Sequence, residues 1–432
     1  MLCFGLFMSL TEATRPTETL IPQKTFFAFL HFYQPQRSVF RPDTKSISIV
    51  PIINEKIYKQ CYQPLLDYGD ALRPGVAFSL YSSLRHWIAK NHPTNWEKIK
   101  KNINNLEDKE YQVVADPLIH AIIPLLNDDD KRILIQAGRN IFKKDFGFDA
   151  KGIWLPEGAV NTDTLKILVE AGYEFVVLKN NQLNNSLHNP VWINLGEGKK
   201  IAVVHFNSNT SDIVASQPER TINGDYFLND FGQNGIAFGT DGETMGHHYK
   251  DKDKFIKYIT EPRTLQRHGL VPFKIKEALS NFQPSKTTTL KENSSWSCAH
   301  GTSRWTGDCN CDGASEATNA KKRNYFQKLN TYNQIINNAL NEIFPNWQME
   351  FTNLLVDLGE NILNGSDFIS SLNNLPNNNL RCLYIAKIYG LLGMTSCGWF
   401  FGTKSHTIEQ NIPQQSIEII EAILPILINR SG

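Results

Sequence analysis

Short apolar runs alternate with segments of helical period over the first two thirds of the chain. The apolar runs are rich in β-branched and aromatic residues, which is typical of buried strands. They lie at residues 25–30, 111–115, 151–155, 174–178, 200–206 and 235–240. Strands that alternate with helices in this way predict a parallel sheet covered by helices.

One segment between two predicted strands has clear helix signals. In NTDTLKILVEAGY, Asn161 or Thr162 can cap the first turn, Leu165 and Leu168 share one apolar face, and Gly172 provides a stop. The segment therefore predicts a compact βαβ unit with a right-handed crossover. Several such units in succession close naturally into a barrel.

The character of the chain changes near residue 315. Long, Asn-rich segments of helical period follow, at 324–344, 380–394 and 415–428, and a polar loop at 364–380 separates two of them. We therefore expect three parts. They are a poorly ordered extension (1–24), a (β/α)7-type barrel (25–314) and a helical region packed on the barrel (315–432).

Composition narrows the classes of partner. The chain has 432 residues, of which 44 are Lys or Arg and 43 are Asp or Glu, so the formal net charge is +1. Without a basic block, neither nucleic acid nor an anionic membrane surface is expected as the main partner. No apolar stretch reaches the roughly 18 to 20 residues that a membrane-spanning helix needs.

The cysteines and the N-terminal residues bear on the cellular compartment of the protein. Seven cysteines are spread sparsely over the chain, which does not form a disulfide framework. The start, MLCFGLFMSLTEATRP, has no Lys or Arg before its apolar run and no small-residue cleavage site. We therefore expect a cytoplasmic protein.

Ionisable side chains follow four of the predicted strands. His31 and Asp241 come directly after apolar runs, Glu157 follows Pro156 after another, and His205 follows the apolar residues 200–204. Three further ionisable residues follow the last of these strands, namely Glu243, His247 and His248. Any one of them is typical of a solvated loop. Because the carboxyl ends of parallel strands converge on one face, the joint pattern predicts a single cleft.

Glu157 and Asp241 are the most informative pair in this pattern. Two carboxyl groups in one cleft can divide into a charged nucleophile and a proton donor of raised pKa, as glycoside cleavage requires. Flat aromatic rings suit the apolar faces of sugars, and core packing is the alternative for each ring. The tryptophans near the polar segments are Trp154, Trp296, Trp305 and Trp399.

Four ordered segments resemble those of a known family. They are HFYQP (31–35), HAIIP (120–124), GIWLPEGA (152–159) and FGTDGETMGHH (238–248). Together they resemble glycoside hydrolase family 57, whose retaining, α-glucan-active members have an incomplete (β/α)7 barrel. The chain is also similar to a bacterial subgroup of this family through SSWSCAHG (294–301), DCNC (308–311) and TSCGWFF (395–401).

The resemblance implies roles for individual residues. Glu157 would be the nucleophile that forms a glycosyl ester, and Asp241 the general acid/base. His31 and His120 would hydrogen-bond sugar hydroxyls, with Trp154 as a wall of the same subsite. Three more residues would shape that pocket, namely Glu243, His247 and His248.

The predicted function is that of a metal-independent enzyme without a cofactor. It would act on an α-glucan or a related oligosaccharide by hydrolysis or by transfer, as an amylase, a 4-α-glucanotransferase or a branching enzyme. The sequence does not predict an oligomeric state.

Two alternatives remain at this stage. A metal-dependent carbohydrate deacetylase or a mannosidase-like hydrolase could use His31, His120, Asp241, His247 and His248 as ligands. The spacing of these residues shows no His-x-x-x-His or His-x-His pair, and such a site leaves Glu157 without a role. The other alternative is a carbohydrate-binding protein that has lost turnover.

A separate cluster of soft ligands raises the question of a structural metal. Cys298 and His300 are followed by Cys309 and Cys311, a set that could hold zinc. These spacings are tighter than in the usual Cys-x-x-Cys knuckle. The sequence favours free, partly buried thiols here.

Overall fold

The computed structural model describes residues 24–36, 39–41, 50–69, 72–186, 189–281, 286–311, 313–375, 377–400 and 408–428. Of the extension expected at 1–24, residues 1–23 lie outside this part of the chain. None of the helices in the described ranges has the length and apolar character needed to cross a bilayer.

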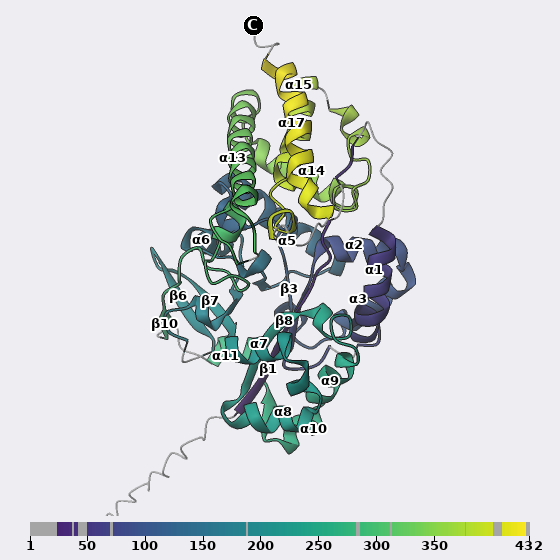
Figure 1. The fold of residues 1–432 in the computed structure, drawn as a ribbon, viewed down its shortest axis with the longest axis vertical. Coiled ribbons are helices and arrows are strands. Elements are labelled where there is room, and N and C mark those ends of the chain that lie inside the picture. The colour runs from purple at the N-terminus through teal and green to yellow at the C-terminus, as the bar shows by residue number, and fades with distance from the viewer. Residues whose placement is uncertain are drawn as a thin grey trace, which may run out of the picture.

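Seven parallel strands follow one another around a barrel in the described residues (Figure 1). They are β1 (Lys24–Phe32), β2 (Val76–Leu80), β3 (Val113–Val114), β4 (Gly152–Ile153), β5 (Phe175–Lys179), β7 (Lys199–Phe206) and β8 (Ile236–Asp241). One sheet runs β3-β2-β1-β8, and in the other β7, β5 and β4 are neighbours. A parallel bridge between Ala115 and Ile153 joins β3 to β4.

The barrel is incomplete on its remaining side. Beyond the end of β7, the Asn207 N–H donates to the Ala237 carbonyl of β8 over 3.0 Å, and the two strands form no ladder. The prediction of an α/β fold with an incomplete (β/α)7 barrel is therefore confirmed. Three strands lie outside the ring, namely β6 (Val191–Gly196), β9 (Leu270–Pro272) and β10 (Thr287–Thr288).

The sequence analysis missed β2, β6, β9 and β10. All four have six residues or fewer. Three of them, β6, β9 and β10, lie in polar surroundings, and β2, with the sequence VAFSL, is followed closely by the start of a helix. Its position between β1 and β3 is nevertheless central to the barrel.

Alternation of side chains along β1 separates two apolar cores. Phe27 and Phe29 point into the barrel, where they pack with Trp154, Phe175 and Phe206. The intervening residues of β1 pack outward against the helices and belong to the larger core. Because successive residues of a strand point to opposite faces, His31 continues the inward series and lies at the top of the barrel interior.

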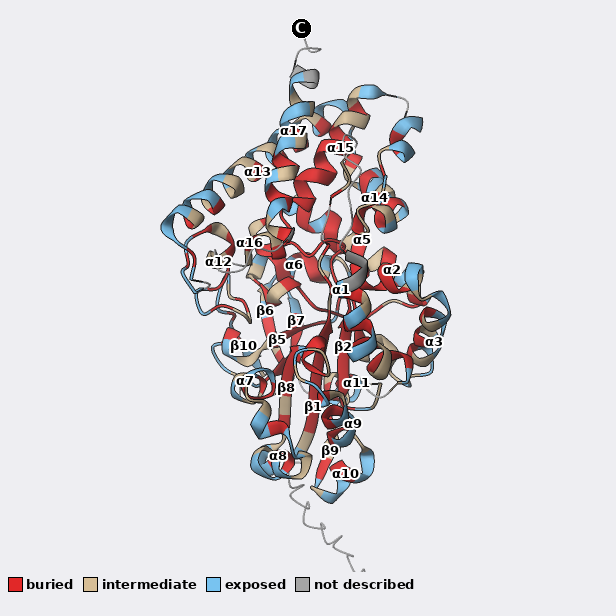
Figure 2. Cartoon of the chain, turned by 45° about the vertical axis from the view of Figure 1, so that its right-hand side comes forward, coloured by how far each residue is buried: buried red, intermediate tan, exposed pale blue. Residues whose placement is uncertain are grey.

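Helices cover the outside of the barrel (Figure 2). They are α1 (Val50–Ile57), a π-helix (Tyr58–Asp67), α2 (Ser82–Asn91), α3 (Pro93–Asn104), α4 (Lys109–Gln112), α5 (Asp128–Phe146), α6 (Thr162–Glu170), α7 (Ser208–Ser216), α8 (Gly224–Phe231), α9 (Lys252–Ile259), α10 (Pro262–Arg267) and α11 (Ile275–Asn281). The helix α6 begins as expected, since the Asn161 side chain accepts a hydrogen bond from the Thr164 N–H.

The C-terminal part of the chain is helical, as expected, and stands at one end of the molecule (Figure 1). It contains α13 (Glu316–Ile343), α14 (Trp347–Leu363), α15 (Asn378–Leu392), α16 (Cys397–Phe400) and α17 (Ile412–Ile428), and the short helix α12 (Ser303–Thr306) precedes it. The helix α15 packs against α13 and α17, while α14 packs against α5 of the barrel.

A buried ion pair connects this helical region to the barrel. The Lys387 ammonium of α15 lies 2.5 Å from the Asp130 carboxylate of α5, and both side chains are almost fully buried. The amides of Asn333 and Asn337 on α13 add hydrogen bonds to Lys387 and Asp130, respectively, at 3.4 Å. Two of the many asparagines in this region thus satisfy buried charges.

Breaking this pair should destabilise the whole chain. Lys387→Met leaves the Asp130 carboxylate buried without its cation, which typically costs about 3–5 kcal/mol. The free energy of unfolding from denaturant titration measures the effect. As a control, Lys328→Met removes the half-exposed pair with Glu421 between α13 and α17, where we expect little change. Equal effects of the two substitutions would contradict the prediction.

Candidate active site

A cavity of about 870 Å³ opens where the carboxyl ends of the barrel strands meet. Most of the residues singled out from the sequence line it, namely His31, His120, Glu157, Asp241, Glu243, His247, His248 and Trp296. These positions are far apart in the sequence, and the barrel brings them together.

Strand register places His31 beside Asp241. In the β1–β8 ladder, His31 is the partner of Asp241, the last residue of β8. On the other side of β1, His31 is paired with Ser79 of β2. Partners in a parallel ladder present their side chains to the same face of the sheet, so all three face the barrel interior.

Glu157 lies in a single helical turn, Pro156–Gly158, directly after β4. Its φ of 57° is in the left-handed region, which is uncommon for a residue other than glycine. The turn is held from outside, because the Trp296 N–H donates to the Glu157 carbonyl over 3.0 Å. The Ser297 hydroxyl donates to the carboxylate over 2.8 Å. A Cβ at Gly158 would lie 3.2 Å from the Cβ of Trp296, so little space remains there for a larger residue.

The surroundings raise the pKa of the two carboxyl groups to different extents. Burial raises the pKa of Glu157, while Ser297, Trp296 and the positive charge of Arg304 oppose the rise. Burial raises the pKa of Asp241 well above its ordinary value, and the negative charges of Glu243 and Glu157 raise it further. Although Asp241 is open to the cavity, its carboxylate accepts no hydrogen bond from the described residues. Hydrogen-bond donors thus oppose the rise in pKa at Glu157, whereas no described donor opposes it at Asp241.

Glu243 is buried beside Asp241 and is surrounded by donors. The Tyr62 hydroxyl, the Tyr33 N–H at 3.2 Å and the Gln34 amide at 3.4 Å all donate to Oε1 of Glu243. Burial raises its pKa to about 7, against the lowering effect of these hydrogen bonds. The sequence analysis identified Glu243 but none of its donors. Tyr33 and Gln34 lie within the quoted HFYQP segment, whereas Tyr62, on the π-helix, carries no local signal.

The two inner histidines are neutral and oriented by serines. Nδ1 of His31 lies 2.7 Å from the Ser79 hydroxyl, and Nδ1 of His120 lies 2.6 Å from the Ser396 hydroxyl. Burial lowers the pKa of His31 to about 3 and that of His120 well below its ordinary value. Nε2 of His120 is buried and has no partner among the described residues. The Tyr33 ring stacks on His120 at 3.9 Å between ring centroids.

The four tryptophans differ in position. Trp296 lines the cavity, and Trp154 is fully buried beneath it, with ring centroids 4.8 Å apart. Trp305 and Trp399 are also buried and do not line the cavity. Their expected place at the substrate is not what the structure shows, because they pack in the C-terminal part. Phe400, which the sequence analysis did not single out, lines the cavity instead.

His247 and His248 contribute to the cavity from the turn that follows β8. Nδ1 of His247 lies 2.8 Å from Oε1 of Gln60, and burial lowers the pKa of both histidines. On another side, Asp212 of α7 pairs with Lys179 at 2.8 Å, and both line the cavity. The N-cap of α7 is Asn207, whose side chain accepts from the Thr210 N–H, so Asp212 is free of a capping role.

The cavity does not gather a set of metal ligands. Among the described residues, one group of three or more His, Cys, Asp or Glu side chains lies close enough to share a metal ion, and it consists of Cys298, His300, Cys309 and Cys311. None of these four residues lines the cavity. The geometry thus gives no support to the alternative of a metal-dependent hydrolase built on the cavity histidines.

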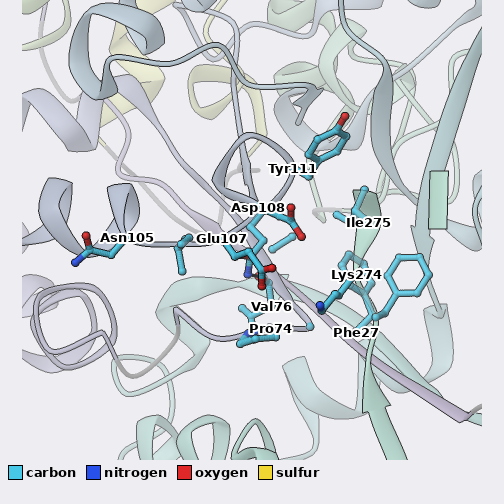
Figure 3. A pocket seen from close by; sticks show the side chains of 14 residues that line it. Phe27, Pro74, Val76, Asn105, Glu107, Asp108, Tyr111, Lys274 and Ile275 are labelled. Atoms are coloured by element: carbon cyan, nitrogen blue, oxygen red, sulfur yellow. Dashed lines mark hydrogen bonds between the residues drawn. The ribbon is translucent and has the colours of Figure 1, made fainter. Parts of the chain in front are cut away.

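A second cavity, of about 240 Å³, lies at the opposite, amino-terminal end of the barrel strands (Figure 3). Phe27, Val76 and Ile275 give it an apolar floor, and Asp108 and Lys274 lie at its edge. Asp108 is paired with Lys276 at 3.0 Å. No group of candidate catalytic residues faces this cavity, so the chemistry of the site belongs to the larger one.

Comparisons with known proteins agree with this geometry. A segment of 126 residues is 30% identical to "Alpha-amylase 1" of Dictyoglomus thermophilum, covering 29% of this chain and 18% of that one. Over 127 residues the chain is 27% identical to "4-alpha-glucanotransferase" of Thermococcus litoralis, covering 29% and 18%. The matched segments thus span about a fifth of the length of these two relatives.

The fold has solved counterparts. An exo-type maltose-forming amylase from Pyrococcus sp. ST04 superimposes with a TM-score of 0.67 at 14% identity, covering 94% of this chain and 81% of that one.

The model of "Glycosyl hydrolase family 57" matches residues 22–291, which include the barrel strands, Glu157 and Asp241. The chain therefore belongs to glycosyl hydrolase family 57.

Proposed function

We propose that the protein is a retaining enzyme that cleaves or transfers α-glucans or related oligosaccharides. The observation that carries this proposal is the pairing of Glu157 and Asp241 in one cavity with pKa values raised unequally. Unequal proton affinities divide two carboxyl groups between attack and proton donation. The names of the two relatives, an amylase and a glucanotransferase, fit either outcome of that chemistry.

The first step uses both carboxyl groups at once. The Glu157 carboxylate attacks the anomeric carbon, while Asp241 gives its proton to the glycosidic oxygen as the bond to carbon breaks. A glycosyl ester on Glu157 and a free leaving sugar result. In the second step the Asp241 carboxylate takes a proton from water or from an acceptor hydroxyl, whose oxygen attacks the anomeric carbon and releases Glu157.

The histidines supply hydrogen bonds to the sugar bound between these carboxyl groups. A neutral imidazole offers one donor and one acceptor, and a serine hydroxyl already occupies Nδ1 of both His31 and His120. Nε2 of His120 is left for a sugar hydroxyl, since no described residue forms a hydrogen bond with it. The faces of Trp296 and Phe400 provide apolar surface for sugar rings.

The helical part of the chain completes this site. We infer that residues 25–314 form the catalytic barrel, and that residues 315–432 contribute Cys397, Phe400 and Glu409 to the cavity wall. Ser396 from the same region orients His120. Described residues of two of the quoted segments, Trp296 and Ser297 of the first and Ser396, Cys397 and Phe400 of the second, thus lie at the site, which supports a place in the bacterial subgroup that the segments resemble.

Removing either carboxyl group tests the proposal directly. With maltooligosaccharides and amylose as substrates, we expect Glu157→Gln and Asp241→Asn each to lower kcat by about 10³-fold or more. Asp163→Asn, on the exposed face of α6, is the matched control and should keep full activity. Full activity in either site variant would refute the assigned roles. Binding of substrate without turnover by the wild-type protein would instead support a carbohydrate-binding protein that has lost catalysis.

The two roles can be separated with a glycosyl fluoride. Fluoride leaves without protonation, so Asp241→Asn should still form the glycosyl ester but should hydrolyse it slowly. Peptide mass spectrometry should then find the sugar attached to Glu157. An adduct on another residue, or inversion of the anomeric centre in the product, would exclude this mechanism.

The pH dependence of kcat/KM should report the two carboxyl groups separately. Asp241 must be protonated, so activity falls as pH rises through its pKa. Glu243→Gln removes a negative charge that raises this pKa, and the basic limb should therefore move to lower pH. Ser297→Ala removes a donor that lowers the pKa of Glu157, so the acidic limb should move to higher pH. Movement of the same limb in both variants would contradict the assignment.

A further inference from the structure

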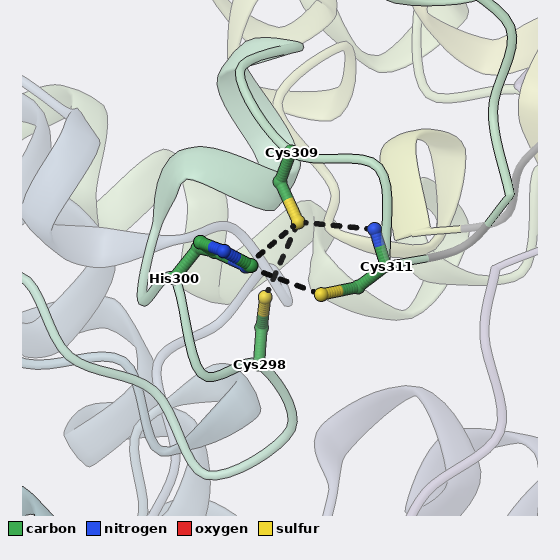
Figure 4. A group of neighbouring side chains, drawn as sticks. All are labelled: Cys298, His300, Cys309 and Cys311. Carbon is green, nitrogen blue, oxygen red and sulfur yellow. Dashed lines mark hydrogen bonds between the residues drawn. The ribbon is translucent and has the colours of Figure 1, made fainter.

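Three cysteines and a histidine converge beside the cavity, outside its lining. Cys298 and His300 come from one short segment, and Cys309 and Cys311 from another (Figure 4). Their Sγ and Nδ1 or Nε2 atoms all lie within 4.8 Å of one another. Figure 4 shows the four side chains pointing toward a common centre. The sequence favoured free, partly buried thiols here, and the structure places these thiols and His300 around one point.

The separations are within a few tenths of an ångström of those in a tetrahedral zinc site for three of the atom pairs. Zinc holds thiolate sulfur at about 2.3 Å and imidazole nitrogen at about 2.0–2.1 Å, which places neighbouring ligand atoms about 3.5–3.8 Å apart. Here Sγ of Cys298 and Sγ of Cys309 are 3.6 Å apart. Nδ1 of His300 lies 3.4 Å from Sγ of Cys309 and 3.1 Å from Sγ of Cys311. A disulfide would need two sulfurs only and would not draw His300 and Cys311 to the same point.

The backbone and a nearby cation suit a negatively charged metal–thiolate centre. The Cys311 N–H donates to Sγ of Cys309 over 3.3 Å, as peptide groups commonly do to metal-bound thiolates. The Arg304 guanidinium, from the segment between the two ligand pairs, donates to the Ser297 carbonyl over 3.5 Å, one residue before Cys298. Three thiolates and a neutral imidazole around a divalent ion leave one net negative charge, and this arginine places a positive charge in the same segment.

We propose that Cys298, His300, Cys309 and Cys311 bind a structural Zn²⁺ ion. Three sulfur ligands and one imidazole select a soft, tetrahedral divalent metal. Four protein ligands fill the coordination sphere, so the ion has no open position for water or substrate. Its role is therefore to hold the chain, and it does not take part in the glycosidic chemistry.

The metal would fix the segment that contacts Glu157. Trp296 and Ser297, which bond the backbone and carboxylate of Glu157, directly precede the first ligand, Cys298. On the far side, the Arg323 guanidinium of α13 donates to the Gly307 carbonyl over 2.7 Å. One ion thus ties the cavity wall to the longest helix of the C-terminal region.

Metal content of the full chain tests the proposal. The wild-type protein, purified with a reductant and dialysed against metal-free buffer, should retain about one zinc per chain by elemental analysis. Cys309→Ser and His300→Ala should each lower the retained zinc at least about tenfold. Cys382→Ser, which removes a thiol of α15 outside the cluster, should leave the zinc content unchanged. Retention of zinc by both cluster variants would overturn the ligand set.

Measurements on the wild-type chain keep the test decisive if the variants do not fold. Replacement of zinc by Co²⁺ should give the intense absorption of cobalt–thiolate charge transfer. Removal of the metal by a chelator should increase hydrogen exchange in residues 294–311 more than in the barrel strands. A protein that takes up no zinc after reduction and reconstitution would refute the proposal. So would a thiol titration that finds two fewer free thiols than the seven cysteines of the sequence, since that result indicates a disulfide.

These results are distinguishable from a failure of the proposed function. Zinc content, cobalt absorption and hydrogen exchange do not depend on turnover. Loss of glucan cleavage in Glu157→Gln together with unchanged zinc content would uphold both conclusions independently.

Discussion

Burial of three acidic groups around one confined space governs the candidate active site. Glu157, Asp241 and Glu243 lie around one cavity, and each has its pKa raised mainly by burial. Three ionised carboxylates there would repel one another strongly, so the least compensated group retains a proton. Hydrogen-bond donors decide which group that is. Ser297 donates to Glu157 and Tyr62 donates to Glu243, while Asp241 has no such donor in the described chain.

The barrel provides the constraint that makes this arrangement possible. Alternation along β1 fills the interior with Phe27 and Phe29 and then places His31 above them. Register with β8 puts Asp241 at the same level. The floor of the cavity is therefore rigid and apolar, which explains both the desolvation of the carboxyl groups and the neutrality of the histidines.

Residues at strand ends were predictable from the sequence, but their partners were not. Glu157 and Asp241 follow apolar runs, so local pattern places them at the carboxyl edge of the sheet. Ser79 and Tyr62 act on the site from β2 and the π-helix, and nothing in their local sequence marks them. Ser396 lies in the quoted TSCGWFF segment, but its contact with His120 was not predictable from that segment. The short strand β2 was missed for the same reason, since five residues carry too little periodicity.

Two tryptophans show the same limit of prediction from local sequence, because here the sequence suggested a place at the cavity that the fold does not give them. Nearness in sequence to a polar segment suggested that Trp305 and Trp399 face the substrate, but both side chains are buried in the structure. Trp399 donates its indole N–H to the Gly393 carbonyl over 3.0 Å and packs within the helical region. Side-chain direction within a short helix depends on packing partners that are distant along the chain.

The left-handed backbone at Glu157 has an evolutionary consequence. Holding a residue with a Cβ in this conformation costs on the order of 1–3 kcal/mol. Glycine at this position would relax the turn but would abolish the carboxyl group. Selection for thermostability and selection for chemistry therefore act in opposite directions at this one position. Under the proposed mechanism, a descendant that no longer needs the Glu157 carboxyl group would gain stability by replacing this residue.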